Sequence, residues 1–251
     1  MMLKSNTRSV ASGLLLGVLA TVCLGSVQAA EDWKPEEGFT SLFNGKDLTG
    51  WRYPGTKGEI LDGKTETADK RIEVKDGVIF IHEKDKDGKG GIKDLYTVKD
   101  FDKPFHLKLQ FRAGLKADSG LYIRGPQLQV RDYPRFGGEY SKVPGFKLDD
   151  WNDLDITVGA PTSVTKVNGK VLEANDVFEL AYKDGKPSAK LNGKEVNVAN
   201  YQHQTNVCTA LCKNNGEVLE KAYPVPLKGG IGLQAETGKF EFRRIRIKDL
   251  P

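Results

Sequence analysis

The stretch Phe105-His106-Leu107-Lys108-Leu109-Gln110-Phe111-Arg112 decides the fold class of this 251-residue chain. Apolar and polar side chains alternate strictly along it. Because successive side chains of a β-strand point to opposite faces, the pattern predicts a strand with one face in a core and the other toward solvent or a ligand.

Other segments show the same alternation, and turn dipeptides separate several of them. For example, Asp76-Gly77 lies between the apolar-polar runs 71–75 and 78–83, and Asp-Gly pairs tolerate the positive φ angles of tight hairpin turns. The further predicted strands are 121–124, 128–132, 154–158, 164–167, 177–182, 231–236 and 240–247.

After the first thirty residues, no segment keeps apolar side chains at helical spacing over three turns, so the sequence predicts an all-β fold. About a dozen strands in one open sheet would leave long edges exposed. We therefore expect two packed antiparallel sheets, a jelly-roll sandwich, in a single domain over residues 31–251. The segment 197–226 has little pattern and is predicted to be a long inserted loop.

The first thirty residues have the features of a secretory signal peptide. Lys4 and Arg8 form a basic start, residues 10–27 are mostly apolar and uncharged, and Val27-Gln28-Ala29 places small residues where a signal peptidase needs them. A retained membrane anchor would need about twenty strongly apolar residues, whereas several Gly, Ser and Thr residues interrupt this stretch. We expect residues 1–30 to be removed, leaving a periplasmic or extracellular protein that is not held in a membrane.

Composition narrows the possible partners. The chain has 38 Lys and Arg against 34 Asp and Glu, a formal net charge of +4, which is too balanced for a nucleic-acid-binding arm. With 38% hydrophobic and 29% charged residues, neither a disordered chain nor a polytopic membrane protein fits.

Cys208 and Cys212 are the cysteines that remain after the predicted signal peptide. Export to an oxidising compartment predicts a local disulfide between them. A metal site that also uses His203 is the alternative, but no fourth ligand has a recognisable spacing.

Several phrases of the sequence occur together in one known family. They are Gly-Phe-Thr-Ser-Leu-Phe-Asn-Gly-Lys-Asp-Leu-Thr-Gly-Trp at 38–51, Ser-Gly-Leu-Tyr-Ile-Arg-Gly at 119–125, Gly-Leu-Gln at 232–234 and Phe-Arg-Arg-Ile at 242–245. From about residue 38 to 250 the chain resembles the 3-keto-disaccharide hydrolase family. The resemblance implies a concanavalin-like jelly roll and the cleavage of glycosides whose sugar carries a ketone at carbon 3.

A 3-keto sugar needs less catalytic machinery than an ordinary glycoside. The ketone acidifies the proton on carbon 2, so one base can remove it, the enolate can expel the group on carbon 1, and water can add afterward. At the positions of the family motifs, Asp132 and Glu236 are the candidate bases, and Arg124 is the candidate cation for the ketone oxygen.

The candidate sugar-binding residues are mostly amides. Gln127 and Gln129 share one face of their predicted strand, and amides donate and accept hydrogen bonds but do not titrate. Trp151 could stack on a sugar ring. The remaining candidates are Gln234 in the closing motif, and Glu139 and Lys142 in a Gly- and Pro-rich segment.

Each of these residues also has a structural interpretation. Arg124 could bridge to a carboxylate at a strand edge, Asp132 could begin a turn, and Trp151 could cover the rim of the core. Gln127 replaces an acid that many family members carry, which favours a sugar reader over a pair of hydrolytic carboxylates.

The sequence therefore predicts an exported protein that cleaves 3-keto-glycosides, with a small carbohydrate as its partner and no nucleic acid. A non-catalytic carbohydrate-binding domain on the same fold is the alternative, and a structural surface module is a third. No cofactor is expected. A divalent ion that polarises the ketone stays an open alternative, because carboxylates and amides could hold Ca²⁺ although no loop has a recognisable spacing.

Overall fold

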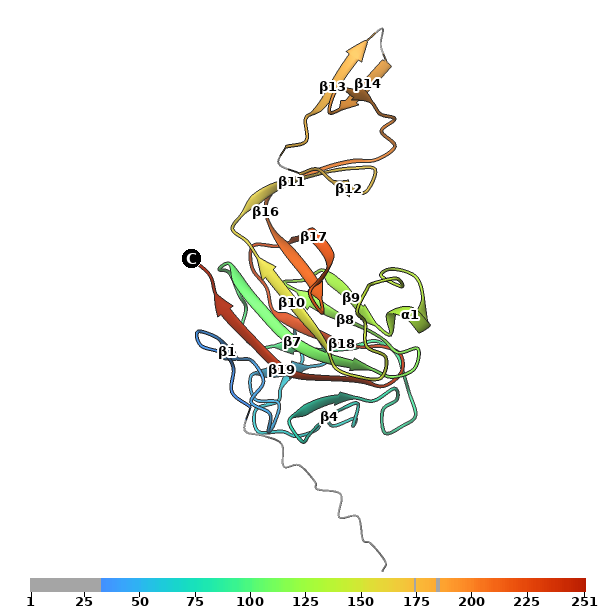
Figure 1. Cartoon of the computed structure of the whole chain (residues 1–251). Helices are drawn as coiled ribbons and strands as arrows, with labels where there is room; N and C mark the ends of the chain where they lie inside the picture. Colours follow the sequence, from blue (N-terminus) through green and yellow to red (C-terminus); the bar gives the residue numbers. More distant parts are fainter. Residues whose placement is uncertain (1–32, 174, 184–185) are drawn as a thin grey trace, which may run out of the picture. The chain divides into compact units, whose positions relative to one another are not determined.

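The strand predicted from the alternating stretch is β7 (Phe105–Ala113), whose side chains alternate between buried and half-buried along its whole length. It lies inside the largest sheet, between β10 (Asn152–Val158) and β19 (Phe240–Asp249) (Figure 1). Phe105, Leu107, Leu109 and Phe111 are fully buried, so the apolar half of the pattern forms core.

The computed structural model describes residues 33–251 apart from 174 and 184–185, and the strands within them form three antiparallel sheets. The ten-stranded sheet contains β12 (Lys170–Val171), β11 (Thr162–Val167), β16 (Tyr201–Asn214), β10, β7, β19, β5 (Val78–Ile81) and β4 (Ile72–Lys75), with β1 (Thr40–Ser41) beside β19 and β17 (Glu217–Val225) beside β16. The six-stranded sheet has the order β3 (Glu59–Ile60), β2 (Trp51–Tyr53), β6 (Lys93–Thr97), β18 (Ile231–Ala235), β8 (Asp118–Ile123) and β9 (Gln127–Arg131). A short helix, α1 (Tyr133–Phe136), follows β9.

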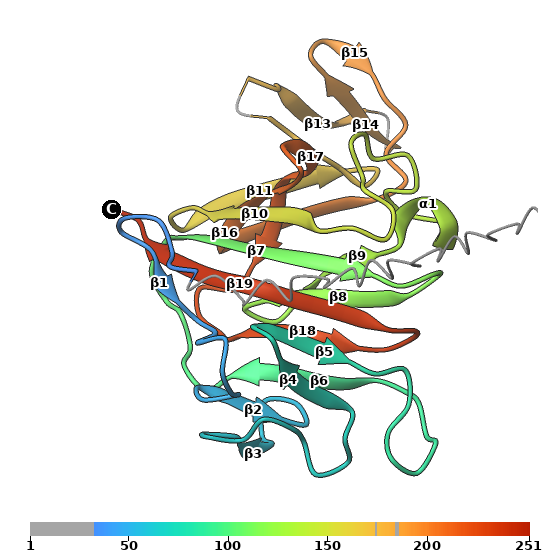
Figure 2. The ribbon, with the colours of Figure 1, turned by 60° about the horizontal axis from the view of Figure 1, so that its bottom comes forward.

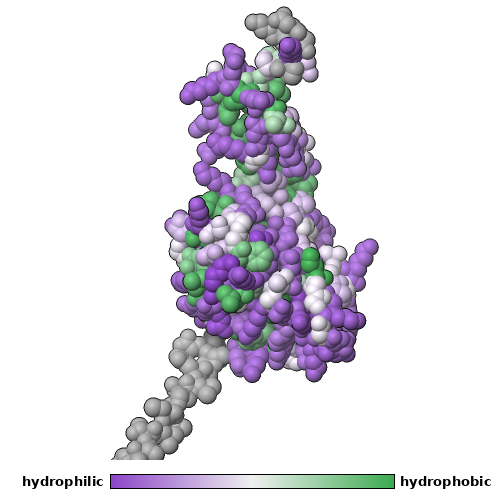
Figure 3. Space-filling view, turned by 90° about the vertical axis from the view of Figure 1, so that its right-hand side faces the viewer, coloured by the Kyte–Doolittle hydropathy of each residue, from purple (hydrophilic) through white to green (hydrophobic). Residues whose placement is uncertain are grey.

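The two large sheets pack face to face, as Figures 1 and 2 show. Apolar side chains from both form one core cluster, which includes Leu121 and Leu233 of the six-stranded sheet and Phe111 and Phe242 of the ten-stranded sheet. The chain crosses repeatedly from one sheet to the other, as in a jelly roll. The predicted all-β jelly-roll sandwich of two antiparallel sheets is confirmed. On the face of the molecule in Figure 3, hydrophilic residues predominate and hydrophobic ones form small patches.

The segment 197–226 is not the inserted loop that its weak pattern predicted. Most of it forms β16 and β17, a hairpin that continues the ten-stranded sheet beside β10. The first half of β16 is exposed, and the register to β17 shifts between Ala210 and Cys212 and again before Lys213. Exposure on both faces and bulges both disturb the period-two signal, which explains the wrong prediction.

The excursion from the sandwich lies earlier in the chain. After β10 the chain forms β11 and β12, then a separate three-stranded sheet, and returns through β16 (Figure 2). This small sheet contains β13 (Phe178–Lys183), β14 (Lys186–Leu191) and β15 (Lys194–Glu195). We call residues 159–200 the excursion.

Cys208 and Cys212 are both free and buried, so the predicted disulfide is wrong. They lie four positions apart in the same strand, β16, where an extended backbone separates their Cα atoms by roughly 13 Å. A disulfide requires Cα atoms within about 7 Å of each other. Both thiols instead pack in the apolar core.

The predicted signal peptide, residues 1–30, lies outside the described residues. Within the described part of the chain, none of the helical structure has the length and apolar character needed to cross a membrane.

Candidate active site

The outer face of the six-stranded sheet carries the largest group of the residues predicted to bind sugar. In β8, Ser119, Leu121 and Ile123 are fully buried and point into the core, so Asp118, Gly120 and Tyr122 take the outer face. The same alternation in β6, β9 and β18 turns polar side chains outward. We call this surface the polar face; its side chains are Asp94, Tyr96, Asp118, Tyr122, Gln127, Gln129, Arg131, Gln234 and Glu236.

Strand register brings the two predicted segments, 127–129 and 234–236, onto this face. β8 lies between β9 and β18, with Leu121 opposite both Leu128 and Leu233. Neighbouring strands are only about 4.8 Å apart, so long side chains reach across β8. Gln127 Nε2 donates to Gln234 Oε1 at 2.6 Å, which joins the two segments directly.

Two tyrosines extend this amide pair. Gln234 Nε2 donates to the Tyr122 hydroxyl at 3.1 Å, and the rings of Tyr96 and Tyr122 lie 5.2 Å apart at 30°. Amides and phenol hydroxyls that are fixed by each other form a rigid hydrogen-bonding surface beside aromatic rings. Such a surface suits a sugar, which combines hydroxyl groups with apolar C–H faces.

Two glycines make room for these side chains. A Cβ on Gly120 would lie 2.1 Å from Gln127 Nε2, and a Cβ on Gly232 would lie 2.7 Å from the Tyr96 ring. Gln127 and Tyr96 can lie across the sheet only because positions 120 and 232 have no side chain. Glycine is therefore required at both positions, because a neighbouring side chain lies directly against the backbone there.

We expect Gly120→Ala to fold but to bind sugar weakly. The new methyl group displaces Gln127 from Gln234, which costs about 1 kcal/mol of unfolding free energy and weakens sugar binding roughly tenfold. Thermal unfolding and sugar titration measure the two effects. The control is Gly159→Ala, whose Cβ meets no atom closer than 3.9 Å and which should leave both quantities unchanged. If Gly120→Ala and Gly159→Ala bound the sugar with equal affinity, the Gln127–Gln234 pair would have no part in sugar binding.

Carboxylates gather at one end of the polar face. Asp118 is 6% exposed, and its Oδ1 accepts hydrogen bonds from Gln129 Nε2 at 2.5 Å and from the Ser119 N–H at 3.0 Å. Arg131 Nε lies 3.0 Å from the same oxygen. The Asp118 backbone forms a bridge with Thr237, the residue after Glu236, so Glu236 is brought close to this group.

Burial and mutual repulsion favour the protonated forms of these acids. Burial raises the pKa of Glu236, and the negative charges of Asp118 and Asp94 raise it further, while Arg131 opposes them. Burial also raises the pKa values of Asp118 and Asp94. Carboxylates whose pKa values are displaced toward neutrality are suited to taking up and releasing protons.

Arg71 fixes the backbone of Glu236. It is fully buried, and its guanidinium donates to the Glu236 carbonyl at 2.9 Å, to the Gly91 carbonyl at 3.1 Å and to the Lys89 carbonyl at 3.4 Å. The segment after β18 and the loop before β6 are thereby attached to one fixed cation.

The structure does not support Asp132 as the base. Its side chain is fully buried, because position 132 follows Leu128 and Val130 on the core-facing side of β9. Asp132 Oδ2 accepts from Arg135 Nε at 2.5 Å and from the Lys116 N–H at 2.8 Å. Asp132 therefore connects Arg135 of α1 to the turn before β8 and does not contribute to the polar face.

Arg124 also has a structural environment. It follows β8 at the end opposite Asp118, with a positive φ of 56°, and is 3% exposed. Its guanidinium lies 5.0 Å from the centroid of the Phe105 ring and donates to the carbonyls of Lys103 and Pro226. It therefore cannot hold a ketone oxygen on the polar face, whereas the strand parity of Arg131 places that guanidinium there.

Trp151 precedes β10 in the ten-stranded sheet and is not part of the polar face. Arg243 and Arg112 lie over its ring, with guanidinium carbons 3.8 and 4.9 Å from the centroid. Glu139 and Lys142 are exposed in the segment after α1, and Glu139 lines a groove described below. None of the three joins the amide pair.

Sequence reasoning did not select Asp118, Arg131, Asp94 or Tyr122. The alternation in Gln127-Leu128-Gln129-Val130-Arg131 was already visible and places Arg131 on the same side as the two glutamines. Asp94 and Tyr122 depend on the order of strands in the sheet, which a single strand's pattern does not give. Among the described His, Cys, Asp and Glu residues, no group of three or more is arranged to hold a metal ion.

Comparison with known proteins gives one family and several remote structures. Residues 38–248 match the family model of the 3-keto-alpha-glucoside-1,2-lyase-like domain. The comparison with curated proteins gave no match.

Three solved structures illustrate the remote likenesses. A protein from Parabacteroides distasonis, provisionally described as a glycosyl hydrolase, is 22% identical with a TM-score of 0.46, covering 86% of this chain and 95% of its own. The carbohydrate-binding module CBM66 of Bacillus subtilis is 10% identical with a TM-score of 0.32, covering 80% and 97%. Porphyranase B of Zobellia galactanivorans is 9% identical with a TM-score of 0.33, covering 86% and 97%. With TM-scores below 0.5, these likenesses decide nothing about this chain.

Proposed function

Because the chain belongs to the 3-keto-alpha-glucoside-1,2-lyase-like family, we propose that it is an exported enzyme that cleaves 3-keto-glycosides on its polar face. The observation that carries this proposal is the position of Glu236, a carboxylate with a raised pKa beside an ordered set of amides and tyrosines. The composition of residues 1–30 supports export.

The proposed reaction begins with proton transfer. The Glu236 carboxylate removes the proton from carbon 2 of the keto sugar, and the electron pair of that C–H bond forms an enolate with the ketone at carbon 3. The guanidinium of Arg131 neutralises charge on the enolate oxygen, in place of Arg124. Gln127, Gln129 and Gln234 hold the hydroxyl groups that orient the ring.

The enolate then expels the substituent on carbon 1. The C1–O bond breaks, the ketone re-forms with a double bond between carbons 1 and 2, and the leaving oxygen takes a proton from an acid. Asp118 and Asp94 are suited to that role, since burial raises both of their pKa values. Water adding across the double bond, with its proton on carbon 2 and its hydroxyl on carbon 1, yields the free 3-keto sugar.

The proposal is tested by incubating the protein with the 3-keto and the unoxidised forms of the same disaccharide and measuring sugar release. We expect release from the keto form alone, because only that form has an acidic proton on carbon 2. Binding of both forms without release would make the polar face a carbohydrate-binding surface. Release from both at similar rates would contradict the elimination mechanism.

A further inference from the structure

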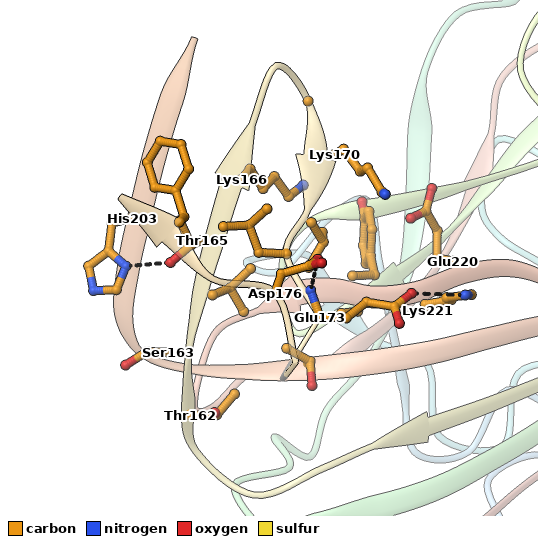
Figure 4. A pocket seen from close by; sticks show the side chains of 18 of the residues that line it. Thr162, Ser163, Thr165, Lys166, Lys170, Glu173, Asp176, His203, Glu220 and Lys221 are labelled. Atoms are coloured by element: carbon orange, nitrogen blue, oxygen red, sulfur yellow. Dashed lines mark hydrogen bonds and ion pairs between the residues drawn. The ribbon is translucent and has the colours of Figure 1, made fainter. Parts of the chain in front are cut away.

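A concave surface separate from the polar face lies between the excursion and β17. It is a groove of about 1260 Å³, lined by side chains of β11, β12, the segment 172–178, the start of β16, and β17 (Figure 4). This volume exceeds the roughly 300–1,000 Å³ of ordinary small-molecule pockets, so the groove suits an extended ligand better than a single ring.

The groove lining combines apolar side chains with two stacked aromatic rings, which we call the aromatic wall. Val164, which is 4% exposed, and Leu172 are apolar members of the lining. Phe178, the first residue of β13, stacks on Tyr201, the first residue of β16. Their ring centroids are 5.6 Å apart and their planes are inclined by 17°. Tyr201 is 44% exposed, so one face of this aromatic pair is available to a ligand. A flat, rigid aromatic surface of this kind binds the C–H face of a sugar ring.

Charges of both signs lie around the aromatic wall. Lys221 Nζ pairs with Glu173 Oε1 at 3.0 Å, and Asp176 Oδ2 accepts from the Glu173 N–H at 2.8 Å (Figure 4). The lining contains Lys166 and Lys170 as well as Glu139 and Glu220. Such a mixture favours neither a polyanion nor a polycation, but it offers many donors and acceptors to a neutral polyhydroxyl ligand.

One residue links the groove to β9, the strand that carries Gln127 and Gln129. Tyr223 of β17 lines the groove, and its hydroxyl donates to the backbone carbonyl of Gln127 at 2.6 Å. Gln127 is the residue whose side chain pairs with Gln234 on the polar face. One lining residue of the groove is therefore bonded to the strand that carries the polar-face amides, which puts the groove on the β9 side of that face.

We propose that the groove binds the further sugar residues of a neutral oligosaccharide whose terminal 3-keto ring lies on the polar face. The inference rests on the proposed function for that terminal ring, but it concerns a separate surface. It assigns a substrate class, 3-keto-oligosaccharides rather than disaccharides alone, with the leaving group held by the aromatic wall and the lysines of the excursion.

Calorimetric titration with unoxidised maltotetraose and cellotetraose tests the groove without any need for catalysis. We expect the wild-type chain to bind at least one of them, and Tyr201→Ala to bind it about tenfold more weakly, because the aromatic wall is lost. Lys170→Ala, at an exposed lining position, should weaken binding about threefold and guards against misfolding of the first variant. The matched control is Tyr182→Ala in the same excursion, which is 82% exposed and outside the lining.

The outcomes separate this inference from the proposed function. Weaker tetrasaccharide binding by Tyr201→Ala and Lys170→Ala, with normal binding by Tyr182→Ala, supports the groove even if no 3-keto sugar is cleaved. Absence of tetrasaccharide binding by the wild type, or equal binding by all four proteins, overturns it even if 3-keto-disaccharides are cleaved. In an active enzyme, Tyr201→Ala should raise KM for a 3-keto-tetrasaccharide and leave KM for a 3-keto-disaccharide unchanged.

Discussion

Glu236→Gln is expected to lower kcat on a 3-keto-disaccharide by a factor of about 10² to 10⁴, the usual contribution of a positioned base. Glutamine keeps the shape of the side chain and removes only its ability to take a proton. The part of Glu236 that supports the fold is its backbone carbonyl, which accepts from Arg71 and is unchanged by the substitution. Single-turnover release of the leaving sugar measures the effect.

The pH profile identifies Glu236 as the base independently of the size of the loss. A base works when ionised, so kcat/KM of the wild type should rise with pH through a pKa displaced above 4.5 by burial, Asp118 and Asp94. The residual kcat/KM of Glu236→Gln should no longer show this rise on the acid side of the pH profile. A rise that persists unchanged would assign the titration to another group.

The same substitution has an opposite effect on stability. A carboxyl whose pKa is raised by folding binds more protons in the native state, so its contribution to stability is present at low pH and is lost as pH rises through the raised pKa. Glu236→Gln should therefore unfold at a slightly higher temperature than the wild type at pH 7, and at a similar temperature at pH 4. The exposed residue Glu217, changed to Gln, is the control that should alter neither activity nor stability.

Arg71→Met is expected to lower the unfolding free energy by about 3 kcal/mol. The substitution removes donors from three carbonyl oxygens, those of Lys89, Gly91 and Glu236, and these are left without their charged partner. The measurement is chemical denaturation at pH 7. Lys86→Met, at an exposed position of the same loop, should change stability by less than about 0.5 kcal/mol.

Activity should fall with this loss of stability, since Arg71 fixes the backbone that carries the proposed base. At a temperature where the variant is still folded, kcat should fall at least about tenfold, because a base displaced by 1 Å loses its geometry. If Arg71→Met had the same unfolding free energy as the wild type, water would have to replace the guanidinium. Arg71 would then have no role in fixing the backbone of Glu236.

The fold could be predicted because its signal is local. The alternation from Phe105 to Arg112 requires only that a strand have one buried face, and β7 meets that requirement residue by residue. The same alternation places four predicted residues on one surface, because β9 and β18 lie on either side of β8 in one sheet. These residues are Gln127, Gln129, Gln234 and Glu236.

The errors in the candidate site have equally physical causes. Counting from a motif selected Asp132, although its parity with Leu128 and Val130 places it on the core side of the strand. Trp151 and its neighbours show the alternation of a strand, as predicted. The pattern within one strand does not reveal which of the two sheets contains that strand, and β10 belongs to the ten-stranded sheet. Arg124 turns away because the backbone takes a positive φ at that residue, and no side-chain periodicity predicts this.

The two unlinked thiols of β16 have a practical meaning for work with this protein. Because Cys208 and Cys212 form no disulfide in the folded chain, this part of the fold does not require an oxidising compartment, and production in a reducing cytosol suits it. Because both sulfur atoms are sealed from solvent in the folded chain, a maleimide dye would label them only when the sandwich opens. The rate of labelling at Cys208 and Cys212 therefore measures how often the sandwich opens.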